Sequence, residues 1–168
     1  MKPVKEATQE DLFCIEQQLG RKPRNVYAIA YRCPCGKPAV VETQPRLEDG
    51  TPFPTFYYAT CPRLTGAIST LESTGLMTEM NLRLAADTDL ADAYAAAHDD
   101  YLIVRSALGI DVPEIDGISA GGMPDRVKCL HSLVAHSLAA GPGVNPLGDE
   151  ALAKLPQWWL EQPCCAVE

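Results

Sequence analysis

The sequence predicts an α+β domain in which a small antiparallel sheet of about three strands is packed by four to six helices. Short runs rich in β-branched and aromatic residues gather between residues 26 and 60. The connections between these runs are short and contain turn-forming Gly, Pro and Asp, which favours an antiparallel meander. Over most of the remaining chain, apolar residues recur at helical spacing.

One helix and three strands are expected in the N-terminal third. Thr8 can cap a helix that runs to Leu19, and Gly20 can end it. Cys14 lies on or beside the apolar stripe of this helix, so it is interpreted as a packing residue. The three strands are then expected over residues 26–31, 39–43 and 55–60.

The rest of the chain is predicted to be helical, with one long loop. Residues 110–122 are rich in Gly, Pro and acidic residues, which is typical of a connection inside a domain. The stretch 141–149 is interpreted as a turn between helices, or as a ligand-contacting loop, in which Asn145 or Asp149 caps the next helix. Helices are expected over residues 62–74, 78–86, 87–109, 123–140 and 149–155.

The composition is that of a single soluble globular domain over residues 1–168, with a core at about 26–155 and a flexible tail at about 160–168. A formal charge of −8 argues against a general nucleic-acid surface, which needs phosphate-neutralising Lys and Arg. No apolar run approaches the ~20 residues of a membrane span, and the N-terminus lacks the apolar centre of a signal peptide. We therefore expect a cytoplasmic protein.

Four cysteines carry the main functional signal. Proline and glycine restrict the backbone around Cys33 and Cys35, and a proline follows Cys61. Cys129 lies in the expected helix 123–140. The chain has seven cysteines, an odd number, so a disulfide framework is not expected in a reducing compartment. Thiolates from separate segments are typical of metal sites, and we predict one formed by Cys33, Cys35, Cys61 and Cys129.

This hypothesis leaves the cofactor open. Zn²⁺ is expected if all four cysteines bind, whereas a [4Fe–4S] cluster becomes more attractive if only three do. Buried thiols without a metal are the structural alternative. Residues 129 and 131 are about 200° apart on a regular helix, so His131 is not expected to share an ion with Cys129. His136 lies ~10 Å further along the helix and is expected beside the site.

A second hypothesis is an enzyme that acts on a small anionic, phosphorylated substrate. Polar residues gather on one side of the predicted helix 123–140, which indicates either a solvated face or the floor of a pocket. Cationic side chains would bind the anion, and His131, His136 or Asp125 would move protons, although His131 also fits a packing role. The residues of this predicted pocket are Arg46, Arg63, Asp125, Arg126, Lys128, His131 and His136.

A third hypothesis is an interaction module without chemistry. The acidic surface and the pair Trp158 and Trp159 would dock on a protein partner. This hypothesis predicts a contiguous exposed apolar patch near the C-terminus.

Four motifs resemble the bacterial DUF501 family, and the resemblance extends from about Val26 to Leu155. They are Arg-Cys-Pro-Cys-Gly-Lys-Pro (32–38), Pro-Arg-Leu-Glu-Asp-Gly-Thr-Pro-Phe-Pro-Thr (45–55), Thr-Cys-Pro-Arg-Leu (60–64) and Gly-Met-Pro-Asp-Arg-Val-Lys-Cys-Leu-His (122–131). The resemblance implies a small intracellular protein of uncharacterised function. The family is often encoded beside a septum-formation protein and an exopolyphosphatase-like enzyme, which implies a partner in cell division or phosphate metabolism.

The resemblance also bears on the metal site. The family pattern centres on the cysteines that match Cys33, Cys61 and Cys129, which makes Cys35 the least secure ligand. Three fixed sulfurs would favour a cluster with an open iron, or a three-cysteine metal site.

Overall fold

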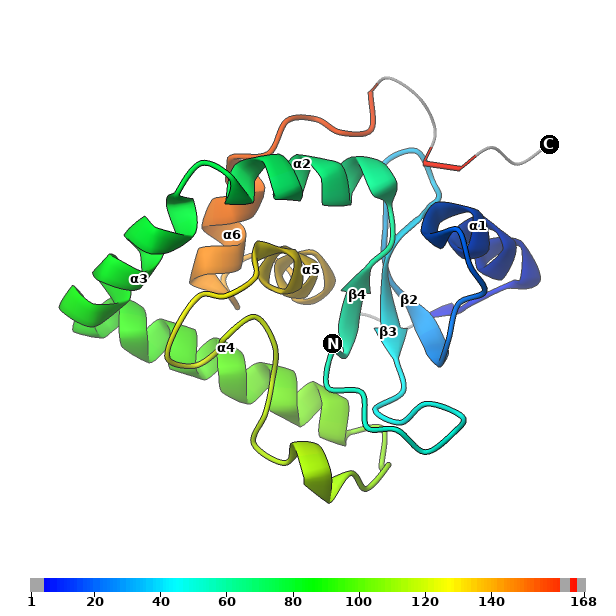
Figure 1. The fold of residues 1–168 in the computed structure, drawn as a ribbon, viewed down its shortest axis with the longest axis horizontal. Helices are drawn as coiled ribbons and strands as arrows, with labels where there is room; N and C mark the ends of the chain where they lie inside the picture. The colour runs from blue at the N-terminus through cyan, green and yellow to red at the C-terminus, as the bar shows by residue number, and fades with distance from the viewer. Residues whose placement is uncertain (1–4, 161–163, 166–168) are drawn as a thin grey trace.

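A four-stranded antiparallel sheet separates the first helix from the five later ones (Figure 1). The structure is a computed structural model that describes residues 5–160 and 164–165. Its elements are β1 (Lys5–Glu6), α1 (Gln9–Leu19), β2 (Val26–Arg32), β3 (Pro38–Thr43), β4 (Tyr57–Ala59), α2 (Pro62–Glu72), α3 (Leu76–Ala86), α4 (Thr88–Ser106), a 3₁₀ turn η1 (Pro113–Ile115), α5 (Leu130–Ala140) and α6 (Pro146–Ala153).

The predicted α+β class and its three strands are confirmed. The strand order β1-β2-β3-β4 follows the chain, and every neighbouring pair is antiparallel. All six residues of β3 are buried, because this strand is covered on both faces. The two-residue strand β1 was not predicted and extends the sheet beside β2.

The two faces of the sheet carry separate apolar clusters. On one face, Ile15 of α1 packs against Ile29 and Val41. On the other, Val40 joins the main core, which is centred on α5. Residues 133–138 of α5 are all buried, as expected for a helix surrounded by other elements. In Figure 1, α5 is seen nearly end-on between α2, α4, α6 and the sheet.

The expected helix caps are largely confirmed. Thr8 caps α1 through the Asp11 N–H, and Gly20 ends that helix with a left-handed φ of 70°. Asn145 caps α6, because its Oδ1 accepts from the Gly148 N–H at 2.9 Å. Asp149 instead accepts from the Gly143 N–H and closes the turn before α6.

The expected helix over residues 123–140 is wrong in its first half. Residues 123–125 form turns, residues 126–129 have no regular structure, and α5 begins only at Leu130. Asn81 of α3 binds both backbone groups of Val127, at 2.8 and 3.0 Å, and the Tyr94 hydroxyl donates to the Arg126 carbonyl at 2.9 Å. These tertiary hydrogen bonds satisfy the backbone groups that a helix would otherwise pair.

The expectation that disulfides are absent is also wrong. Cys14 of α1 and Cys165 form a disulfide that joins positions 151 residues apart. Cys14 is buried as expected, but the bond gives it a role beyond packing. The tail expected to be flexible lies partly outside the described residues, although Cys164 and Cys165 are described and buried. None of the described helices is both long and apolar enough to cross a membrane.

Candidate metal centre and a second thiol group

Four thiols from three parts of the chain lie near one another in the main core, three of them in a tight group. The Sγ atoms of Cys33, Cys35 and Cys164 lie within 4.8 Å of one another, and Cys35 and Cys164 are 3.3 Å apart. The thiol of Cys61 contacts that of Cys164. We call Cys33, Cys35, Cys61 and Cys164 the four-thiol group. Cys61 and Cys164 are buried, and Cys61 is fully inaccessible.

A tight turn fixes the first two sulfurs. The Gly36 N–H donates to the Cys33 carbonyl at 2.7 Å, and Gly36 has a φ of 88°, which favours glycine. The turn also directs backbone N–H groups at sulfur: that of Cys35 to Cys33, and that of Lys37 to Cys35. Donors placed in this way stabilise thiolates, which are the form that binds metal.

The other two sulfurs come from a helix start and from the tail. Cys61 is the buried N-cap of α2, and its side chain makes no capping hydrogen bond to the helix. The neighbouring disulfide, Cys14–Cys165, holds Cys164 in place against the turn. Sequence reasoning missed Cys164, because the Cys-Cys pair in a proline-containing tail gave no indication that it folds back on the domain.

The thiols of the group differ in acidity. Burial raises the pKa of Cys33 and of Cys164, and the neighbouring thiols raise that of Cys164 further. Burial also opposes ionisation of Cys35, but the N–H groups of Lys37 and Cys164 outweigh it and lower the pKa of Cys35. Cys35 therefore loses its proton more readily than Cys33 or Cys164.

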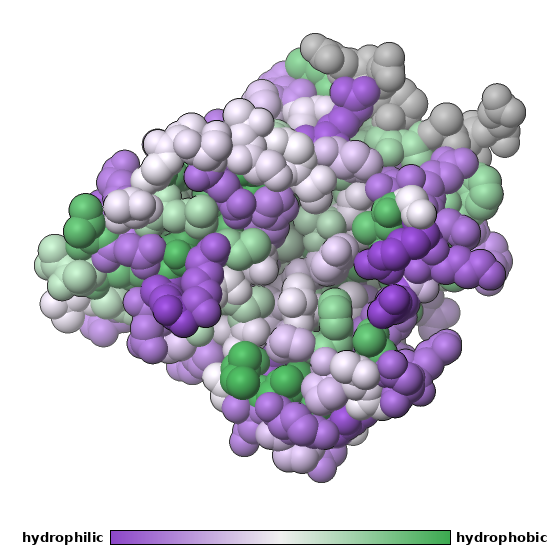
Figure 2. Space-filling model, in the orientation of Figure 1, coloured by the Kyte–Doolittle hydropathy of each residue, from purple (hydrophilic) through white to green (hydrophobic). Residues whose placement is uncertain are grey.

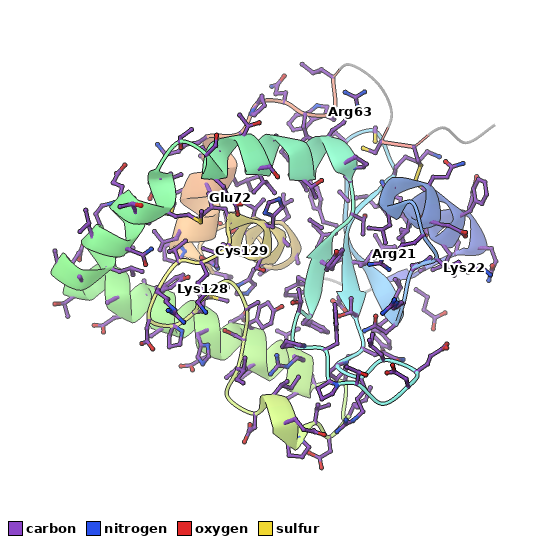
Figure 3. All side chains as sticks on the ribbon, viewed as in Figure 1. Arg21, Lys22, Arg63, Glu72, Lys128 and Cys129 are labelled. Atoms are coloured by element: carbon purple, nitrogen blue, oxygen red, sulfur yellow. A yellow bond between two sulfur atoms is a disulfide. The ribbon has the colours of Figure 1, made fainter. Side chains whose placement is uncertain are left out.

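Cys129 lies in a second group, with Glu72 and His131, and not with the four thiols. One ligand atom from each of these three residues lies within 4.8 Å of the other two. Figure 3 shows Glu72 and Cys129 close together, between the end of α2 and the start of α5. Cys61 and Glu72 lie at opposite ends of the 11-residue helix α2, about 16 Å apart along its axis. The structure thus separates Cys129 from Cys33 and Cys61, contrary to the expected single site.

The expected angular separation of Cys129 and His131 does not apply, because Cys129 is outside the helix. It is the N-cap of α5, with an extended φ of −150° and ψ of 114°. His131 Nδ1 lies 3.1 Å from Glu72 Oε1, and the Leu130 N–H donates to the same oxygen at 2.8 Å. His131 thus belongs to this cluster of polar side chains and is not a packing residue.

His136 is a core residue and not part of a solvent-facing pocket. It is fully inaccessible, with Nε2 at 2.9 Å from Asp100 and Nδ1 at 3.2 Å from the Asn145 amide. Burial lowers the pKa of His136 despite the opposing effect of Asp100. The Asn145 amide donates to Nδ1, since its oxygen is already bound to Gly148, so Nε2 carries the proton.

The remaining residues of the predicted anion pocket do not converge. Arg46 forms an ion pair with Glu114 at 2.7 Å and donates to the Gly50 carbonyl. Arg63 lines a groove beside Trp158, at the start of α2. The others, Asp125, Arg126 and Lys128, are exposed on the loop before α5. The structure therefore does not bring the residues of the predicted anion pocket together.

The tryptophan pair does not form the exposed patch that a docking surface would need. Trp158 is 8% exposed and belongs to the main core, and Trp159 is partly buried against it. Their rings pack edge to face with centroids 4.7 Å apart. This burial removes the observation on which the interaction-module hypothesis depended.

The comparison with known proteins agrees with the motif resemblance. No curated protein and no solved structure matches the chain. One family model, described as "Protein of unknown function (DUF501)", matches residues 29–153. The match includes Cys33, Cys35, Cys61 and Cys129, whereas Cys164 lies beyond it. Because the match spans most of the 168 residues, the chain belongs to the DUF501 family.

Proposed function

We propose that this protein binds one Zn²⁺ ion through its four-thiol group. The observation that carries the proposal is the proximity of three sulfurs within 4.8 Å, with the Cys61 thiol against one of them. Tetrahedral zinc with Zn–S bonds of about 2.3 Å holds its sulfurs about 3.8 Å apart. The Cys35–Cys164 separation of 3.3 Å needs only a small expansion to reach that value.

The spacing of the sulfurs favours a single ion over a [4Fe–4S] cluster. A cluster places a cube of iron and sulfide between its cysteine ligands, so these ligands must stand well apart. The β2–β3 turn would have to open to admit such a cube. Only one residue separates Cys33 from Cys35, and backbone hydrogen bonds within the turn hold the two cysteines close together. A single zinc ion would leave the turn closed and would require only that Cys61, which lies outside the 4.8 Å group of the other three sulfurs, approach them.

The proposed role of the metal is structural. A site with four protein sulfurs is closed, and closed zinc sites contribute folding energy rather than a position for substrate. The ion would join the β2–β3 turn, the start of α2 and the C-terminal tail. Binding would release protons, because the buried thiols must ionise to become ligands.

Metal analysis of the purified protein tests this proposal. We expect about one zinc per chain, and after exchange to Co²⁺ we expect the visible absorption that tetrahedral cobalt thiolates give. Cys61→Ser and Cys164→Ser should each weaken zinc binding by at least ten-fold, measured by competition with a chromophoric chelator. Cys129→Ser is the matched control and should bind zinc like the unchanged protein.

Two results would contradict the proposal. One is a folded protein that carries no stoichiometric metal and takes up no Co²⁺. The other is loss of zinc in Cys129→Ser with normal binding in Cys164→Ser, which would restore Cys129 as a ligand. Broad visible absorption of the protein with bound iron and sulfide would instead favour the cluster.

A further inference from the structure

The seven cysteines fall into three chemical classes, and one class contains a single cysteine. Cys14 and Cys165 form the disulfide, and four cysteines make up the four-thiol group. The remaining one, Cys129, has no second sulfur in its group. Its neighbours are instead His131 and Glu72, the residue types that activate and orient a nucleophilic thiol.

The hydrogen bonds of His131 determine where its protons lie. Nε2 is 3.2 Å from both the Thr65 carbonyl and the Ser69 hydroxyl. The carbonyl accepts only, and the hydroxyl already donates to that carbonyl, so Nε2 carries the proton. Nδ1 faces the Glu72 carboxylate at 3.1 Å, and a carboxylate also only accepts. Both contacts are satisfied together by the imidazolium form. In that form neither nitrogen offers a lone pair, which argues against a metal ion held by this group.

The surroundings of Cys129 favour its thiolate. The sulfur lies at the start of α5, accepts from the Ser132 N–H, and has the Ser132 hydroxyl at 3.8 Å. Burial and Glu72 oppose ionisation, but the nearby cationic ring of His131 and the donors of Ser132 outweigh them and lower the pKa of Cys129. The thiolate in turn raises the pKa of His131 to about 9. The other charged residue next to Cys129 in the chain, Lys128, is exposed.

This group opens on a cleft whose other lining residues are uncharged. The cleft has a volume of about 440 Å³ and is lined by residues of α1, β4, α2 and α5. Besides Cys129 and His131, the lining consists of hydroxyl, amide and apolar side chains, with no Lys, Arg, Asp or Glu among them. The surface below α2 in Figure 2 is mostly pale, and the strongly hydrophilic residues gather beside it.

We propose that Cys129 is the nucleophile of an acyl-transfer site that takes uncharged acyl compounds, such as esters. His131 acts as the proton donor and acceptor, and Glu72 is a positioning residue that holds the imidazole. The lining disfavours a phosphorylated substrate, because its one cation, the His131 imidazolium, is already paired with Glu72 and no Lys or Arg lines the cleft. This inference does not depend on the zinc site.

The reaction has two balanced steps. The Cys129 sulfur attacks the carbonyl carbon and forms an S–C bond, the bond to the leaving alcohol breaks, and the alcohol takes a proton from His131. This leaves a thioester and a neutral imidazole. Water then attacks the thioester and gives a proton to His131, the S–C bond breaks, and the thiolate and imidazolium are restored with release of the acid.

Acetylation with p-nitrophenyl acetate tests the proposal on the zinc-loaded protein, in which the four-thiol group is covered. We expect a burst of nitrophenolate and one acetyl group on the Cys129 peptide, located by mass spectrometry. Cys129→Ser should abolish the burst. A thiol with the ordinary pKa of 9.0 is about 1% ionised at pH 7, so His131→Gln should slow acetylation on the order of 10–100-fold and move its pH profile upward.

The controls separate reactivity from folding. His98→Gln changes another histidine, whose ring contacts Ser119 and none of the three residues of this group, and should leave the burst unchanged. Circular dichroism and zinc content report whether His131→Gln folds, and the pH profile of the unchanged protein tests the thiolate without any substitution. Three results would each overturn the proposal. They are acetylation of another cysteine before Cys129, a pH profile of Cys129 acetylation like that of an ordinary thiol, and a faster reaction with acetyl phosphate than with the ester. Peptide mapping remains decisive even if the protein holds no zinc.

Discussion

The ion pair between Asp11 and Arg32 should make the stability of the fold depend on pH. Asp11 binds both terminal nitrogens of Arg32, at 2.7 and 2.8 Å, and also accepts from the Thr8 N–H in the capping box of α1. Arg32 directly precedes Cys33, so the pair ties α1 to the turn of the four-thiol group. Asp11 itself is only 6% exposed, which limits screening by solvent.

The magnitude follows from the pKa of Asp11. The hydrogen bonds with Arg32 lower this pKa from 3.8 to about 2 against the opposing effect of burial. At 1.36 kcal/mol per pKa unit, the difference corresponds to about 2 kcal/mol of folding free energy. Because the folded-state value is the lower one, this stability is present above pH 3.8 and is lost as the pH falls toward 2.

Asp11→Asn should therefore reduce the free energy of unfolding by about 2 kcal/mol at pH 7, and by progressively less below pH 4. Urea unfolding followed by circular dichroism at several pH values between 7 and 3 measures both effects, and the difference between the two proteins cancels contributions that they share. Glu10→Gln, which removes an exposed carboxylate from the same turn of α1, should change stability by under about 0.5 kcal/mol. A difference between Asp11→Asn and the unchanged protein that stays constant from pH 7 to pH 3 would refute the reasoning.

Further substitutions test the packing and the tail. Gly148→Ala should destabilise the protein by about 1–3 kcal/mol in thermal unfolding, because the new Cβ would overlap a carbonyl and a hydroxyl of α5. Gly66→Ala in α2, where the new Cβ would meet no atom within 4 Å outside the neighbouring helix backbone, should be neutral or stabilising by up to ~1 kcal/mol. Tyr101→Phe should cost about 1–3 kcal/mol in the same assay, since its buried hydroxyl accepts two backbone N–H groups at the start of β4. Cys165→Ser and Cys14→Ser should weaken zinc binding equally in chelator competition, because either change releases Cys164, and unchanged affinity in both would show that the disulfide does not position this sulfur.

The local patterns of the sequence were sufficient for most of the secondary structure. Strand propensity located β2, β3 and β4, and the Thr8 and Gly20 signals located both ends of α1. Such features depend on neighbours in the chain, so a single sequence contains them. The start of α5 was missed because Asn81 and Tyr94, from two other helices, satisfy the backbone before it. No local pattern reports a competing partner that is distant in sequence.

The candidate sites were likewise predictable from the sequence only in part. The sequence by itself determined that Cys33, Cys35 and Cys61 lie in restrained segments, and that Cys129 and His131 come two residues apart. Only the tertiary structure decided that Cys164 joins the first three and that Glu72 joins the other two. The physical reason is that a thiol becomes a ligand or a nucleophile through the atoms that surround it. Those atoms come from α2 and from the tail, which the fold brings to positions that sequence distance does not encode.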